Sequence, residues 1–220
     1  MWHASATLIN TQVLSNTADD GTNGFAGGIG VYQGSQLAIT GSRISNNTAR
    51  LHGGAIEVRN STLSMTNTLI ISNTAANINV LAIDNSAVAI QNCTLADNNP
   101  QGAQAILAFD PPTSTLTIRN SILWNSALSI QWDGPTDTLS VAHTDIQGGW
   151  AGAGNFDADP LFAGAGNYHL QPSSPCIDRG TPVGAPTTDI EGSPRDARPD
   201  MGAYEWQGFR IYLPLTLRNF

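Results

Sequence analysis

An 11-residue pattern, Leu-x-Ile/Met-x-Asn-x-x-Ile-x-x-Asn, recurs along the first two-thirds of this 220-residue chain. The clearest copy runs from Leu63 to Asn73. The other copies begin at Ala6, Leu37, Val88, Leu116 and Leu139. Consecutive copies start 23 to 31 residues apart, and a fixed core with joins of variable length is typical of a solenoid.

Within each copy, two apolar residues stand two positions apart, a turn residue (most often Asn) follows, and another apolar residue comes after it. Because period 2 indicates a strand and the break indicates a bend, each copy predicts two short strands. A third apolar strand is visible at 28–31, 54–58 and 81–83. We therefore predict an all-β fold, a right-handed parallel β-helix of about six coils with three short strands per coil, over residues 6–150. The alternative is an antiparallel β-sandwich, which would not keep a column of Asn at one register.

The Asn at the bend has a physical reason. A bend between strands needs a residue that tolerates the left-handed backbone region, as Asn and Gly do. Stacked Asn amides can also hydrogen-bond from coil to coil. We predict that the turn column forms a structural ladder of Asn10, Asn67, Asn92 and Asn120, with Gly41 and His143 at the same position. A second candidate ladder consists of Asn16, Asn47, Asn73 and Asn98.

Charge and hydropathy exclude several kinds of partner. The net charge of −8 and the pI near 4.6 argue against nucleic acid and against an anionic membrane. No run of 18 apolar residues occurs, so we expect no membrane-spanning segment. The start, Met-Trp-His-Ala-Ser, lacks the basic and apolar regions of a signal peptide. Because an unpaired solenoid edge promotes aggregation, we expect this chain to be a fragment, or one end of a longer exported protein with further coils.

The outward positions of the predicted strands bear on catalysis. Acid–base chemistry on a polysaccharide needs paired carboxylates, or a Ca²⁺ site with a basic residue, on coils about 5 Å apart. The outward columns of the first strand contain no carboxylate, and those of the second contain only Asp145. Arg59 and Asp84 align on neighbouring coils, and we predict that they form an ion pair. We therefore predict no catalytic residues and expect a non-enzymatic protein.

Aromatic residues gather in the last predicted coils. Because aromatic faces are good platforms for sugars, these residues are candidates for contact with a polysaccharide or cell-wall glycan: Trp124, Trp132, Trp150 and Phe109. The competing interpretation is that they pack the end of the core against the C-terminal segment.

The periodicity stops at Trp150, and four motifs follow. They are Asp-Ala-Asp-Pro-Leu-Phe at 157–162, Tyr-His-Leu-x-Pro-x-Ser-Pro-x-Ile-Asp-x-Gly at 168–180, Thr-Asp-x-x-Gly-x-Pro-Arg at 188–195 and Pro-Asp-x-Gly-Ala-Tyr-Glu at 199–205. In this order they resemble the closing module of bacterial exported proteins described as choice-of-anchor Q domain proteins, and the coils at 6–150 resemble the β-helix repeats that precede it. Cys176 and Met201 are departures, since the family pattern has Ala and Ile there. The resemblance implies an exported or cell-surface protein.

Residues 151–208 have the properties of an irregular, loop-rich cap. Their prolines oppose regular strand pairing, and their apolar residues can cover the last coil. We expect the charged residues to form a hydrogen-bond and ion-pair network of Asp178, Asp189, Arg195, Asp200 and Glu205. We expect no metal or other cofactor. The alternative is Ca²⁺ held by oxygen ligands from Asp157, Asp159, Asp189 or Glu191.

Two further features leave alternatives open. Residues 209–220 form an apolar tail that resembles the Leu-Pro-Leu-x-Leu-Arg ends of some exported bacterial proteins, which implies sorting or attachment; the alternative is one more capping strand. Cys93 and Cys176 fit neither a disulfide framework nor a metal site, and a bridge between them is the alternative.

The sequence favours a non-enzymatic, exported or cell-surface β-helix protein that acts in adhesion or glycan contact. One alternative is a carbohydrate-active enzyme, a lyase or hydrolase, whose active coils are missing from this chain. The other is a structural spacer.

Overall fold

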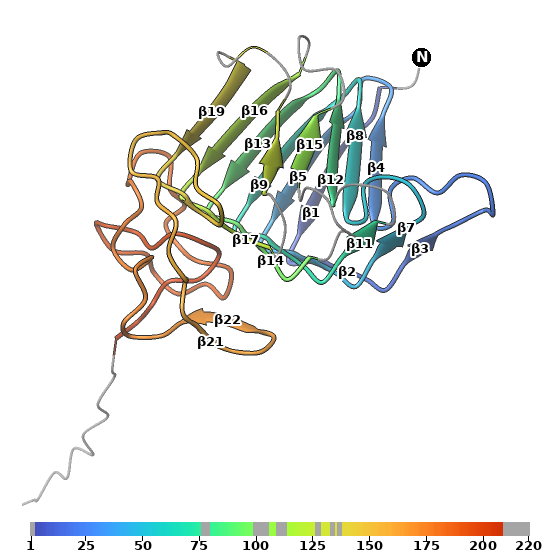
Figure 1. Cartoon of the computed structure of the whole chain (residues 1–220). Coiled ribbons are helices and arrows are strands. Elements are labelled where there is room, and N and C mark those ends of the chain that lie inside the picture. Colours follow the sequence, from blue (N-terminus) through green and yellow to red (C-terminus); the bar gives the residue numbers. More distant parts are fainter. Residues whose placement is uncertain are drawn as a thin grey trace, which may run out of the picture.

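The computed structural model describes residues 3–75, 80–98, 106–108, 114–125, 129–132, 135 and 138–208. Short parallel strands from successive coils lie side by side along a rod, and the C-terminal segment lies against one side of it (Figure 1). In the described part of the chain, no helix is long and apolar enough to cross a membrane.

Three long sheets and one short sheet form the rod. The first sheet contains β1 (Ser5–Ile9), β5 (Gln36–Thr40), β9 (Thr62–Thr66), β13 (Ala87–Gln91), β16 (Thr115–Arg119) and β19 (Leu139–Ala142). The second sheet contains β2 (Gln12–Leu14), β6 (Arg43–Ser45), β10 (Leu69–Ile71), β14 (Thr94–Ala96), β17 (Ile122–Trp124) and β20 (Asp145–Ile146). The third sheet contains β4 (Ile29–Tyr32), β8 (Ile56–Arg59), β12 (Leu81–Asp84), β15 (Ile106–Ala108) and β18 (Ile130–Gln131). The short sheet contains β3 (Thr17–Ala18), β7 (Thr48–Ala49) and β11 (Thr74–Ala75).

The predicted all-β parallel solenoid is confirmed, including the register of the repeat. Leu37 pairs with Leu63, and Leu63 pairs with Val88, so equivalent positions of successive copies stack directly. The coil count is slightly lower than the six expected, because β19 and β20 have no counterpart in the third sheet among the described residues. The short sheet was not predicted, since two-residue strands leave no periodic signal.

The core lies inside the coils. The inward residues Leu63, Met65 and Ile70 are each at most 1% exposed, and their equivalents in neighbouring coils belong to the same apolar cluster. The bends follow the predicted chemistry: φ is +46° at Asn67, +59° at Gly41 and +49° at His143. A side chain at Gly41 would both strain this backbone and approach the Asn10 amide.

A continuous amide ladder follows the second sheet. The Asn47 side-chain oxygen accepts hydrogen bonds from the backbone N–H and the side-chain amide of Asn16, at 3.0 and 2.9 Å. The same pair of bonds recurs from Asn47 to Asn73, from Asn73 to Asn98 and from Asn98 to Asn125. The second ladder is therefore confirmed and extends one coil further than predicted. The bonds between asparagines all run in one direction, from each coil to the next, while the side chains of Asn47, Asn73 and Asn98 also donate to carbonyls of the preceding coil.

The C-terminal segment covers the outer face of the second sheet. Leu69, Ile71 and Ala96 point outward from this sheet, yet they are buried against Tyr168 and Ala203. Farther along, Ile122 packs with Leu170, Cys176 and Met201. The sequence predicted a cap over the last coil. The segment instead also covers the side of earlier coils, along the second sheet.

The segment also has its own short elements. Phe156 continues the second sheet through a bridge to Asp145, and β21 (Phe162–Gly164) and β22 (Asn167–Leu170) form a small antiparallel hairpin. The expected tail, residues 209–220, lies outside the described residues.

Candidate functional site

The predicted aromatic group does not form a single surface. Trp124 packs among the apolar residues between the second sheet and the C-terminal segment, whereas Trp132 and Trp150 pack against the core of the rod. Phe109 lies outside the described residues. All three tryptophans are partly buried and pack against apolar clusters, so part of each side chain serves packing.

The turn-column asparagines attach the C-terminal segment to the rod. Asn67 donates to the Thr188 carbonyl at 2.7 Å, Asn92 to the Asp200 carbonyl at 3.2 Å, and Asn120 to the Thr181 carbonyl at 2.7 Å. Among the described bonds of this column, one joins two of its members, from Asn120 to Asn92 at 3.3 Å. This column mainly docks the segment, while the buried ladder described above joins the coils.

Arg195 is the centre of the segment's charged network. Its guanidinium pairs with Glu205 at 2.8 Å, and the two side chains are 2% and 4% exposed. It also donates to the carbonyls of Gly202 and Ala203, and to the side-chain oxygen of Asn67 at 3.1 Å. A buried arginine therefore links the loops of the segment to the third coil of the rod.

The remaining members of the predicted network surround this pair. Asp189 accepts hydrogen bonds from the backbone N–H groups of Glu191, Ser193 and Glu205. Asp200 accepts from those of Asp178 and Trp206, and burial raises the pKa of Asp200 to about 7. The structure thus brings Asp178, Asp189, Arg195, Asp200 and Glu205 into one region, where they hold loops.

The proposed Ca²⁺ ligands fall into two separate places. Asp157 and Asp159 lie near Asp145, at the end of the second sheet, whereas Asp189 and Glu191 line a groove at the other end of the segment. Within the described residues, no group of three or more His, Cys, Asp or Glu could hold a metal ion.

Both cysteines are free and buried. The Cys176 thiol donates to Asp145 at 3.2 Å, and the Cys93 thiol donates to the Gln91 carbonyl at 3.3 Å. Burial raises the pKa of the Cys93 thiol to about 12, so this thiol stays protonated at neutral pH and is not a reactive thiolate.

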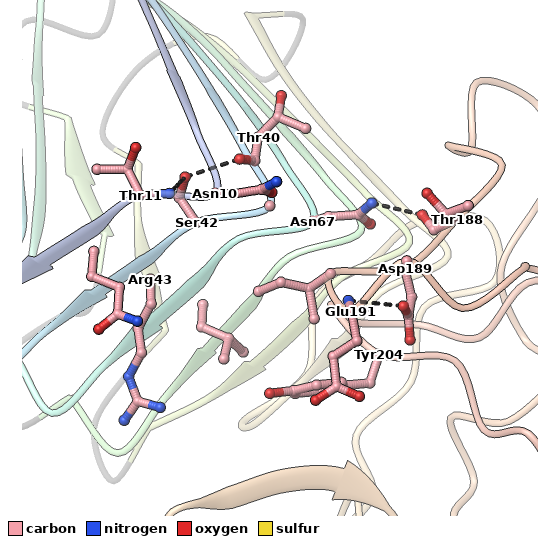
Figure 2. Close-up of a pocket in the computed structure, with 15 residues that line it drawn as sticks. Asn10, Thr11, Thr40, Ser42, Arg43, Asn67, Thr188, Asp189, Glu191 and Tyr204 are labelled. Carbon is pink, nitrogen blue, oxygen red and sulfur yellow. Dashed lines mark hydrogen bonds between the residues drawn. The ribbon is translucent and has the colours of Figure 1, made fainter.

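A groove of about 450 Å³ forms where the segment stops covering the second sheet. One side consists of turn and strand residues from the first coils, including Asn10, Thr11 and Arg43, and the other consists of segment residues 188–192 and Tyr204 (Figure 2). Amide and hydroxyl side chains alternate with apolar residues such as Leu69 and Ile190 in the lining, which suits a ligand with both hydroxyl groups and apolar faces.

Arg43 provides the positive charge of this groove. It is half-buried on β6, and its register neighbours on the second sheet are Gln12 on one side and Leu69 on the other. Its Nε donates to the Ser45 hydroxyl at 3.3 Å. The segment buries Leu69 and stops there, which leaves Arg43 at the open boundary.

Tyr204 lines the opposite side of the groove and is partly buried against the cluster that contains Leu69. Its ring lies against the His169 ring, with centroids 3.9 Å apart, and His169 contacts Glu191 at 3.1 Å. Burial raises the pKa of Tyr204, so its hydroxyl stays protonated at neutral pH. Figure 2 shows Arg43 and Tyr204 on either side of the groove. Tyr204 was not predicted as a site residue, and its only signal in the sequence is its place in the Pro-Asp-x-Gly-Ala-Tyr-Glu motif.

A second cluster lies on the outer face of the third sheet. The predicted pair of Arg59 and Asp84 is confirmed at 2.8 Å, and Arg59 also contacts Glu57 at 3.1 Å. Tyr32 donates to Glu57 at 2.6 Å, and burial raises the pKa of Tyr32 well above its ordinary value. The Glu57 side chain is only 2% exposed, so this carboxylate is enclosed by its partners.

The stacked coils define a parallel β-helix protein, with a laterally docked C-terminal segment and a polar groove at their junction. The chain belongs to the family described as right-handed β-helix region, whose model matches residues 4–146. Comparison with curated proteins gives no relative that matches the chain.

Proposed function

We propose that this chain is a non-enzymatic, glycan-contacting β-helix protein that acts outside the cell or on its surface. The observation that carries the proposal is the groove between the first coils and the segment, which combines amide and hydroxyl groups with the exposed part of the Tyr204 ring. Sugars offer both hydroxyls and apolar ring faces, and amphipathic aromatic residues suit such ligands. The extracellular location rests on the resemblance of the C-terminal motifs to an exported module.

The experiment is a binding screen of the chain against immobilised neutral and acidic polysaccharides, followed by calorimetry with oligosaccharides. We expect binding that the Tyr204→Ala substitution weakens by on the order of 10-fold, because aromatic contacts contribute about 1 kcal/mol beyond burial. Tyr32→Ala is the matched control, since Tyr32 is also a partly exposed tyrosine but lies on the third sheet. Absence of binding to every polysaccharide would favour the structural-spacer alternative.

One observation favours the enzyme alternative. Glu57 and Asp84 lie on neighbouring coils and both contact Arg59, so two carboxylates approach each other on the rod. Glycosidases use such pairs, although a carboxylate as enclosed as Glu57 cannot reach a substrate without rearrangement. The polysaccharides that bind should also be assayed for new reducing ends or unsaturated products. Product that disappears in the Glu57→Gln variant would replace the binding proposal with an enzymatic one.

A further inference from the structure

The charged side chains that line the groove differ in whether they are free to contact a ligand. Arg43 is the one cationic residue among those that line it. Its described hydrogen bond uses Nε, and no carboxylate of the described residues forms an ion pair with it. The outer edge of a guanidinium presents N–H groups in a fork that matches a carboxylate. Arg43 therefore retains donors for an anion from outside the chain.

The two acidic residues of the groove do not neutralise Arg43. The oxygens of Asp189 are occupied by three backbone N–H groups, which hold the 188–193 loop in place. The Glu191 carboxylate contacts Nε2 of His169 at 3.1 Å, on the side of the segment. The positive charge of Arg43 acts on Tyr204 and Tyr168, where it opposes the rise in their pKa caused by burial. A cation thus lies within electrostatic range of the aromatic face.

We propose that the groove binds an acidic glycan, with a sugar carboxylate held by Arg43 and the face of a sugar ring against Tyr204. This inference rests on the proposed glycan-contact function and adds the class of ligand. Gln12 is the register neighbour of Arg43, so an extended glycan chain would continue along the rod towards the first coil. Stacked strands lie about 4.8 Å apart, so outward side chains at one register repeat along the rod at this spacing.

The overall charge of the chain distinguishes a specific contact at Arg43 from non-specific attraction of a polyanion. A net charge of −8 repels a polyanion at long range, so the acidic glycan must be recognised through a local contact. Salt screens the long-range repulsion at about 10 Å in 0.1 M solution and weakens a close bidentate contact much less. We therefore expect affinity for the acidic glycan to hold or rise as salt increases from 20 to about 150 mM. Non-specific binding to a basic patch would fall over the same range.

The test compares two hexasaccharides with the same backbone by calorimetry. One is the β-1,4-linked glucuronic acid hexamer, and the other is the β-1,4-linked glucose hexamer, which carries CH₂OH where the first carries a carboxylate. We expect the acid to bind on the order of 10-fold more tightly, because a charge-assisted hydrogen bond has about this effect. The Arg43→Gln variant should lose this preference and keep its affinity for the neutral hexamer. Arg43→Lys should fall between, since it keeps the charge and loses the fork.

The outcomes separate this inference from the function on which it rests. If the neutral hexamer binds at the Tyr204 side and the acid binds no better, the acidic-ligand inference is wrong and glycan contact stands. A sulfated glucose hexamer that binds more tightly than the acid would overturn the carboxylate assignment. If neither hexamer binds, nor any polysaccharide of the screen, both proposals fail. Circular dichroism and urea unfolding of each variant should match the parent chain, because Arg43 lies at an open boundary.

Discussion

Arg195 and Asn67 are 128 residues apart in sequence and are joined by a hydrogen bond of 3.1 Å. The bond connects the buried ion pair of the C-terminal segment to the turn column of the rod. It shows that the segment is part of the folded unit and not an appended tail, and several predictions depend on this arrangement.

The first prediction concerns the buried ion pair. Replacing Arg195 by Met should lower the free energy of unfolding by about 3–5 kcal/mol, because Glu205 would remain as a buried, unpaired carboxylate. The matched control is Arg198→Met, whose side chain is 73% exposed and contacts Asp178 at 3.3 Å. We expect that control to cost less than about 1 kcal/mol. Urea unfolding measures the free energy of unfolding of both variants. Equal losses of stability would show that the buried pair contributes no more than the exposed one.

The second prediction concerns the buried amide ladder. Asn73→Ala should destabilise the rod by at least about 2 kcal/mol, because it leaves the buried backbone N–H of Asn47 and one N–H of the Asn47 side chain without an acceptor. Asn16→Ala is the control, since Asn16 is the exposed end of the ladder and accepts no such bonds from a described residue. A smaller loss for Asn73 than for Asn16, in the same unfolding experiment, would contradict the ladder's role.

The third prediction concerns the lateral cover. A chain truncated after Ala158 should expose Leu69, Ile71 and Ile122 on the outer face of the second sheet. An apolar strip of this kind promotes association, so we expect binding of a hydrophobic dye and oligomers in size-exclusion chromatography. A chain truncated after Gly208 keeps the cover and serves as the control. Monomeric, dye-negative behaviour of the shorter chain would show that the rod does not need the segment.

The fourth prediction concerns pH. Burial raises the pKa of Asp145 from its ordinary value of 3.8 to about 6, with smaller effects from Asp157 and Asp159. The folded chain therefore holds this proton more tightly than the unfolded chain, and the resulting stabilisation is complete below pH 3.8 and lost as the pH rises to about 6.

An Asp145→Asn variant lacks this titration. Its amide can donate to Cys176 while its oxygen accepts from the Ala158 N–H group. The stability of the variant relative to the parent chain should therefore increase as the pH is raised from about 4 to about 7. Thermal unfolding across this range measures the difference, and parallel curves for the two chains would contradict the assignment.

The repeat was sufficient to predict the coils, because its period specifies both the strand and the face of each residue. Leu63, Met65 and Ile70 are in the core as their spacing indicated, and Asn67 makes the bend. The lateral docking was not predicted, although the signal was present. Leu69 and Ile71 are large apolar residues at outward positions, which indicates a covered face.

The groove could not be predicted from local patterns. Arg43 and Tyr204 are far apart in the chain, and they approach only because the segment folds back along the second sheet. Trp124, Trp132 and Trp150 lie close together in the sequence, which made them candidates for glycan contact, but large aromatic residues most often serve packing. Their positions against the core and the segment follow from that preference.

The turn column has a consequence for how the molecule could change its length. The segment is bound by Asn67, Asn92 and Asn120, on three consecutive coils, whereas the preceding coil has Gly41, which offers no amide. The spacing of these three residues therefore determines where along the rod the segment docks. Coils added before β1 would lengthen the rod and leave the groove intact, because its lining begins at Asn10. A coil inserted between Asn67 and Asn120 would change the spacing of the docking asparagines. The segment could then no longer bind all three, and the two sides of the groove would move out of alignment.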